Sequence, residues 1–158
     1  MDTLQILCTL YDVKNFLGVF LSDLLPHSIT QPGTIIVSCD PHTEDGLYKL
    51  GINFQPKSFS GFYFDSYGLY SYIPSIRSFL KRTCSLWDFN TTQPQVLNSS
   101  VCGKYCCLFA LYLDRGYSPK QFVSLFDPRT ADKQVAQMFT SEFGFSSKKG
   151  LRCVQCCN

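Results

Sequence analysis

The chain has 158 residues, of which 45% are hydrophobic, 15% aromatic and 16% charged, a composition too apolar for a disordered protein. Its formal net charge of +2 gives no overall electrostatic reason to bind nucleic acid. No stretch approaches the ~18 consecutive apolar residues that a transmembrane helix needs, so we expect no membrane partner. The length fits one domain, which we expect to span residues 1–158.

The N-terminal stretch MDTLQILCTLYDVK begins with an acidic residue and lacks the basic region of a secretory signal peptide. We therefore expect an intracellular protein that is not secreted. In a reducing compartment its nine cysteines would be mostly free thiols, and an odd number cannot pair completely within the chain.

Apolar periodicity and turn residues predict helices at both ends of the chain around several central strands. In chain order we expect a helix at 3–12, a strand-like or looped element at 15–26, strands at 34–39, 47–54 and 61–66, a helix at 74–83, a strand at 85–90, and helices at 102–116, 118–126 and 127–144. This order predicts an α+β fold. We expect residues 147–158 to form a loose, cysteine-rich tail.

The segment 102–116 is apolar on nearly every side and ends at Gly116, which predicts a buried central helix. The stretch SSVCGKYCC (99–107) places Cys102 at its N-terminus, where unpaired backbone N–H groups and the helix dipole favour the nucleophilic thiolate. The N–H of Gly103 could also donate to an oxyanion. The local sequence leaves a second interpretation open, in which Cys102 is a buried cysteine that only packs.

The sequence has two histidines, His27 and His42, and each follows a proline in a turn. A thiol hydrolase needs a base beside the thiol, usually an imidazole, and turn histidines are more often surface residues than catalytic ones. The C-terminal CVQCC has Cys153 and Cys156 at the C-x-x-C spacing of zinc ligands, but no second pair lies at a finger-like distance. We therefore expect no metal site.

Several motifs, in order along the chain, resemble those of adenain-type cysteine proteases, the maturation proteases of adenoviruses and of Maverick/Polinton virus-like transposons. The motifs are NFLGVFLSDLLP (15–26), IIVSCD (35–40), GFYFDSYG (61–68) and SSVCGKYCCLFAL (99–111). The resemblance covers residues 16–125. It implies an α+β fold in which a mixed central sheet packs against helices and the nucleophile begins a buried central helix.

The resemblance also implies roles for three residues. Cys102 takes the place of the nucleophile. Gln95, seven positions before it, takes the place of the glutamine whose amide helps to form the oxyanion hole. Asp65 takes the place of the carboxylate that orients the catalytic histidine.

The catalytic histidine itself is missing. Aligning Gly46 with the glycine of the family's G-x-H-W motif puts Tyr48 at the histidine and Lys49 at the tryptophan. A tyrosine has an unperturbed pKa of ~10, so near neutral pH it is protonated and a poor base. The alternative base is His42, if its loop folds back toward Cys102.

Cys84 matches by position a cysteine that, in adenoviral members, forms a disulfide with a short activating peptide. The alternative is an ordinary thiol at a helix end. The resemblance implies no required cofactor, although an activating peptide or DNA serves as one in adenoviral relatives. It implies peptide or capsid-protein partners and, more weakly, nucleic acid.

Together these residues predict the scaffold of a viral or transposon-derived thiol protease, a hydrolase that would process capsid proteins in the host nucleus or cytoplasm and in the virion. Because Tyr48 replaces the histidine, we expect cleavage to be impaired or absent. The alternative is a pseudoenzyme, a pseudoprotease that binds peptides or capsid proteins without cutting them.

Overall fold

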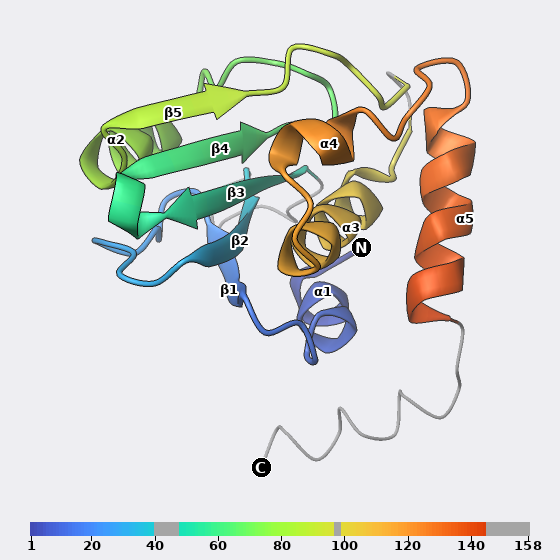
Figure 1. Ribbon diagram of the computed structural model, residues 1–158, viewed down its shortest axis with the longest axis horizontal. Coiled ribbons are helices and arrows are strands. Elements are labelled where there is room, and N and C mark those ends of the chain that lie inside the picture. The colour runs from blue at the N-terminus through green and yellow to red at the C-terminus, as the bar shows by residue number, and fades with distance from the viewer. Residues whose placement is uncertain (40–47, 97–98, 145–158) are drawn as a thin grey trace.

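The structure is a computed structural model that describes residues 1–39, 48–96 and 99–144 (Figure 1). Within these residues, five strands form one mixed sheet whose spatial order equals the chain order. The strands are β1 (Phe16–Leu21), β2 (Gly33–Ser38), β3 (Lys49–Gln55), β4 (Ser60–Phe64) and β5 (Leu86–Phe89). β3 runs antiparallel to both neighbours, whereas the outer pairs β1–β2 and β4–β5 are parallel.

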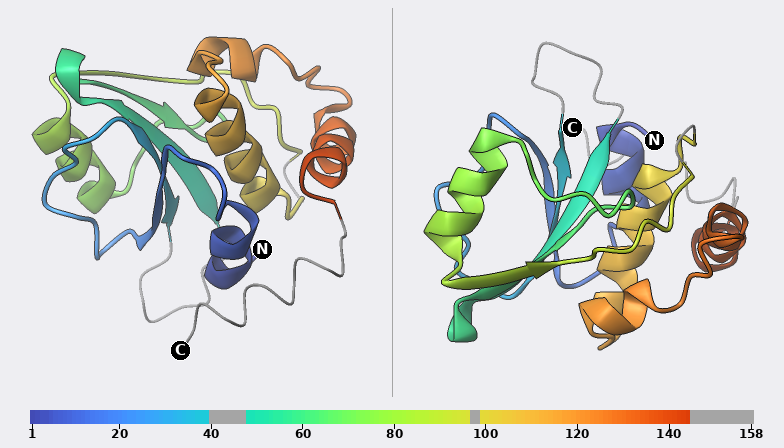
Figure 2. Two further views of the ribbon diagram at one scale, coloured as in Figure 1. Left: turned by 60° about the horizontal axis from the view of Figure 1, so that its bottom comes forward. Right: turned by 90° about the horizontal axis from the view of Figure 1, so that it is seen from above.

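Helices cover both faces of the sheet (Figure 2). α2 (Pro74–Thr83) connects β4 to β5 and packs on one face. The other face is covered by α3 (Cys102–Asp114), and the helices that pack against α3 are α1 (Thr3–Thr9), α4 (Pro119–Val123) and α5 (Ala131–Phe143). A short 3₁₀ helix, η1 (Pro56–Ser58), joins β3 to β4.

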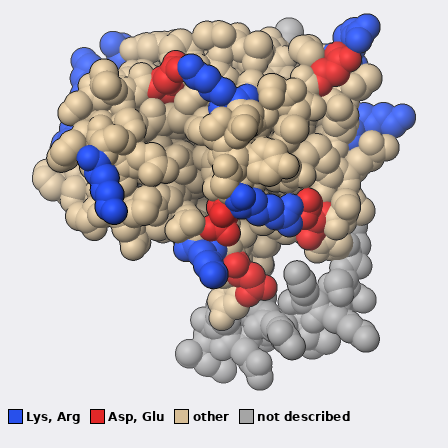
Figure 3. Space-filling model, viewed as in Figure 1, with Lys and Arg blue, Asp and Glu red and all other residues tan. Residues whose placement is uncertain are grey.

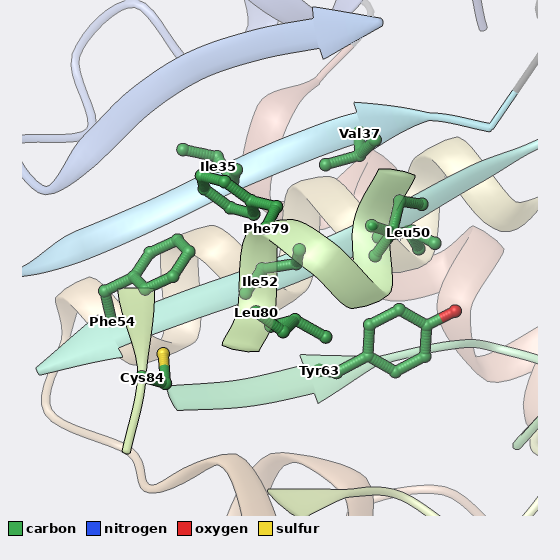
Figure 4. Close-up of a cluster of buried hydrophobic side chains, with 10 residues drawn as sticks. Ile35, Val37, Leu50, Ile52, Phe54, Tyr63, Phe79, Leu80 and Cys84 are labelled. Atoms are coloured by element: carbon green, nitrogen blue, oxygen red, sulfur yellow. The ribbon is translucent and has the colours of Figure 1, made fainter. Parts of the chain in front are cut away.

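The core between the sheet and α2 comes from alternate residues of the strands, because successive strand side chains point to opposite faces. The strand residues are Ile35 and Val37 of β2, Leu50, Ile52 and Phe54 of β3, and Tyr63 of β4; α2 supplies Ile76, Phe79 and Leu80 (Figure 4). Cys84, the residue after α2, closes this core at one end.

The opposite face of the sheet lies very close to α3. A Cβ at Gly51 of β3 would stand 2.7 Å from the ring of Phe109, so glycine is what allows the helix to approach this strand. From Cys102 to Ala110, every residue of α3 is buried except Lys104, which is half-buried. The buried central helix that the apolar pattern predicts is therefore confirmed.

The α+β class with a mixed sheet is also confirmed. Several elements are shorter than expected. The 15–26 segment contains strand β1 only at Phe16–Leu21, α1 ends at Thr9, α4 ends at Val123, and α5 begins at Ala131. Ser118 caps the N-terminus of α4, since its side chain accepts from the backbone N–H of Gln121. The tail at 147–158 lies outside the described residues.

Three buried cysteines, Cys84, Cys106 and Cys107, carry free thiols as expected, whereas Cys8 is disulfide-bonded. In the described part of the chain, no helix combines the length and the apolar character required to cross a membrane.

Candidate functional site

Two of the predicted site residues meet at neighbouring strand ends. Tyr48 directly precedes β3 and Asp65 directly follows β4. These strands are antiparallel, with Gly51 paired to Phe64, so the start of β3 lies beside the end of β4. There the hydroxyl of Tyr48 donates a hydrogen bond to Oδ1 of Asp65. Tyr48 thus binds the carboxylate to which the resemblance assigns a histidine partner.

The carboxyl group of Asp65 is held in a buried position, with only 2% of the residue exposed. Its Oδ1 also accepts from the backbone N–H of Tyr67 at 2.7 Å. Burial raises the pKa of Asp65 above its ordinary value, while the hydrogen bonds from Tyr48 and from the Tyr67 N–H oppose that shift because they favour the carboxylate.

Sequence reasoning missed Asn90, which holds the backbone of Asp65. Its Oδ1 accepts from the Asp65 N–H at 2.9 Å, and its Nδ2 donates to the Asp65 carbonyl at 2.6 Å and to the Thr92 carbonyl at 3.0 Å. Asn90 follows β5, which runs parallel to β4 beside it. The signal that could have identified it is a polar residue directly after an edge strand.

The Tyr48 hydroxyl is a donor and not a base. Burial and the neighbouring charge of Asp65 raise its pKa far above the ordinary value for tyrosine, so it keeps its proton at any physiological pH. The half-buried ring stacks on that of Tyr67, with centroids 5.4 Å apart and planes 20° from parallel.

Gln95 is buried, and both the oxygen and the nitrogen of its side-chain amide form hydrogen bonds. Its Oε1 accepts from the hydroxyl of Ser66 at 2.5 Å. Its Nε2 donates to the Ser99 carbonyl at 2.7 Å and to the Tyr67 hydroxyl at 3.2 Å. The backbone also ties this residue to the strand end, because the Gln95 N–H donates to the Ser66 carbonyl at 2.9 Å.

Cys102 is the first residue of α3 and is 6% exposed. The hydroxyl of Tyr67 donates to the carbonyl of Ser99, three residues before Cys102, at 3.2 Å. Burial and then the charge of Cys102 raise the pKa of that hydroxyl. The structure therefore brings the predicted nucleophile, the predicted oxyanion donor Gln95 and the Tyr48–Asp65 pair around one residue, Tyr67. The resemblance gave Tyr67 no role.

The hydrogen bonds described for His27 and Lys49 are with residues outside this group, and three further sequence candidates lie outside the described residues. The carbonyl of His27 accepts from Arg82 at the end of α2 at 2.8 Å. Lys49 is 1% exposed, and its ammonium group donates to the Ser38 hydroxyl of β2 at 3.0 Å. His42, the alternative base, and the pair Cys153 and Cys156 lie outside the described ranges.

Cys84 is in the core between α2 and the sheet, on the face opposite α3. It is 6% exposed, and burial raises the pKa of its thiol. A protonated, buried thiol is a poor partner for disulfide exchange with a peptide. This geometry favours the alternative interpretation, an ordinary packed thiol.

Compared with known proteins, the chain matches no family model and no curated protein. The case for a function therefore depends on the motifs of the sequence and on the geometry of the residues that carry them.

Proposed function

We propose that this protein is an adenain-type cysteine-protease scaffold that binds peptide or capsid-protein segments and does not hydrolyse them efficiently. One observation carries the proposal: the Tyr48 hydroxyl donates to Asp65 at the position where the resemblance expects an imidazole.

The chemistry follows from that hydrogen bond. Thiol proteolysis requires a group that takes the cysteine proton and later gives it to the leaving amine. Tyr48 cannot take a proton because its oxygen already carries one and its pKa is far above neutral. Asp65, which would orient an imidazole, is instead occupied by the phenol, so this pair supplies neither half of the proton transfer.

Peptides and capsid proteins are proposed as ligands because the resemblance is to maturation proteases of viruses and virus-like transposons. On the same resemblance we propose the host nucleus or cytoplasm, and the virion, as its location. A DNA cofactor has less support. Acidic and basic side chains are interspersed on the face in Figure 3, and three basic residues pair with carboxylates: Arg115 with Glu142 at 2.7 Å, Lys120 with Asp88 at 3.2 Å, and Arg129 with Asp127 at 2.8 Å.

The test compares cleavage and retention of a peptide library by the wild-type chain and by Cys102→Ala. We expect both proteins to retain the same peptides and neither to release new N-termini. Cleavage by the wild type that disappears in Cys102→Ala would overturn the proposal, and retention of no peptide by either protein would remove its binding half. If cleavage occurs, a His42→Ala variant shows whether His42 supplies the base.

The complementary variant is Tyr48→His combined with Lys49→Trp, which rebuilds the family's histidine–tryptophan pair. Cleavage that depends on Cys102 in this variant alone would show that the missing base is what prevents turnover. If the variant folds and stays inactive, a second element of the site is also disabled.

A further inference from the structure

Tyr67 lies between the groups on which the site depends. It belongs to the FDSYG turn, where its ring stacks on Tyr48. Its hydroxyl donates to the Ser99 carbonyl at 3.2 Å and accepts from Nε2 of Gln95, also at 3.2 Å. Ser99, the acceptor of this hydroxyl, lies three residues before Cys102, the first residue of α3.

The amide of Gln95 has two hydrogens, and the structure accounts for both. One points to the Ser99 carbonyl, a backbone group just before α3, and so anchors the side chain. The other has two acceptors within reach, the Tyr67 hydroxyl at 3.2 Å and the Ser99 hydroxyl at 3.5 Å, and the Tyr67 hydroxyl is the nearer. Donation to an oxyanion at Cys102 would require this second hydrogen, since the first is the shorter bond and holds the amide in place.

We propose that Tyr67 is a positioning residue that withholds the Gln95 amide from any carbonyl bound at Cys102, its phenol oxygen taking the hydrogen bond that an oxyanion would take. The inference rests on the proposed function, because it uses the oxyanion role that the adenain resemblance gives to Gln95. It goes beyond that proposal in one respect: the site has lost a second catalytic element independently of the histidine.

A phenylalanine at position 67 would keep the ring that stacks on Tyr48 and remove only the oxygen. The amide hydrogen of Gln95 would then be available to a new acceptor. An aldehyde provides one, because the Cys102 thiolate adds to its carbonyl carbon, a carbon–sulfur bond forms and the π electron pair moves to oxygen. The oxygen then takes from solvent the proton that the thiol released. The resulting hemithioacetal needs no oxidant, and its oxygen lies where a tetrahedral intermediate would carry its charge.

The experiment uses N-acetylglycinal, a minimal peptide aldehyde, and measures how well it protects Cys102 against alkylation by iodoacetamide. Mass spectrometry of the peptide that contains Cys102 gives both the alkylation rate and the aldehyde concentration for half-protection. Alkylation displaces iodide from a saturated carbon and forms no oxyanion, so it reports only the thiol.

In Tyr67→Phe we expect half-protection at an aldehyde concentration lower by about tenfold than in the wild type, the effect of one hydrogen bond to the adduct oxygen. The alkylation rate without aldehyde should stay within about twofold. Adding Gln95→Ala to Tyr67→Phe should abolish the gain. The matched control is Tyr70→Phe, which removes the hydroxyl of a 47% exposed tyrosine and should change neither value.

Equal half-protection in wild type and Tyr67→Phe, absence of an adduct in both, or a gain that persists without Gln95 would each overturn the inference. If Tyr67→Phe fails to fold, Gln95→Ala alone is decisive: it should leave aldehyde protection unchanged, because the amide is already engaged, whereas a tenfold loss would show that Gln95 reaches the adduct. Peptide cleavage by the wild type would defeat the proposed function. It would not decide the inference about Tyr67, which depends only on the aldehyde protection of wild type and Tyr67→Phe.

Discussion

The hydrogen bond from Tyr48 to Asp65 can be tested by Tyr48→Phe, which removes the hydroxyl and keeps the ring that stacks on Tyr67. The acceptor is a carboxyl group that is 2% exposed. A hydrogen bond to a charged group contributes about 1.5–3 kcal/mol, and its removal leaves a buried acceptor without that donor. We therefore expect the free energy of unfolding at pH 7 to fall by about 2–3 kcal/mol.

The loss should depend on pH. Because burial raises the pKa of Asp65 above 3.8 in the folded protein, the folded state binds more protons than the unfolded state between 3.8 and that raised value, and stability falls as the pH rises through this window. The Tyr48 hydroxyl limits this fall, since it stabilises the carboxylate. Without that hydrogen bond the pKa of Asp65 rises further, and the window extends to higher pH.

Below pH 3.8 Asp65 is protonated in both states, and the difference between Tyr48→Phe and wild type should shrink to that of a neutral hydrogen bond, about 1 kcal/mol. Urea unfolding at a series of pH values measures this difference, with Tyr70→Phe as the control for loss of an exposed phenol. A difference that stays constant from pH 3 to pH 8, or one that is absent at pH 7, would refute the electrostatic account of the pair.

Two further predictions concern the core beneath α2 and the residue that holds the backbone of Asp65. Gly61→Ala would place a Cβ 2.7 Å from the sulfur of Cys84, so it should destabilise the fold by about 1–3 kcal/mol. Adding Cys84→Ala should recover part of that loss in a double-mutant cycle of unfolding free energies. Purely additive effects of the two substitutions would contradict this contact. Asn90→Ala leaves the buried N–H of Asp65 without its acceptor, so the free energy of unfolding measured in urea should fall by about 2 kcal/mol or more. Thr91→Ala, at an exposed neighbour, should change it little. Equal stabilities of these two variants would argue against the role of Asn90.

The local elements of the fold could be predicted from the sequence because their signals are local. The apolar spacing in 74–83 matches α2 residue for residue, and the run at 102–116 differs from α3 only in the last turn. Strand order and direction could not be read in this way. They depend on which strand pairs with which, and the parallel pairing of β4 with β5 across α2 has no signature in either strand.

The site could be predicted only in part for a related reason. The resemblance supplied Tyr48 and Asp65, and the antiparallel pairing of β3 and β4 explains why a separation of 17 residues along the chain brings them together. Asn90 lies 25 residues from Asp65, and only the folded sheet makes them neighbours. The acceptors of the Gln95 amide are set by which polar groups the fold brings within hydrogen-bond distance, and the sequence alone does not show this.

The side-chain donors of Gln95 and Tyr48 are hydrogen-bonded within the protein, and this affects the balance between stability and activity. Active-site donors in enzymes are commonly held without a strong partner until the transition state forms, and that arrangement lowers the stability of the resting protein. Here the phenol of Tyr48 and the amide of Gln95 both find acceptors within the chain itself. A variant that regains turnover must break these bonds, so we expect every reactivated form of this scaffold to be less stable than the natural chain.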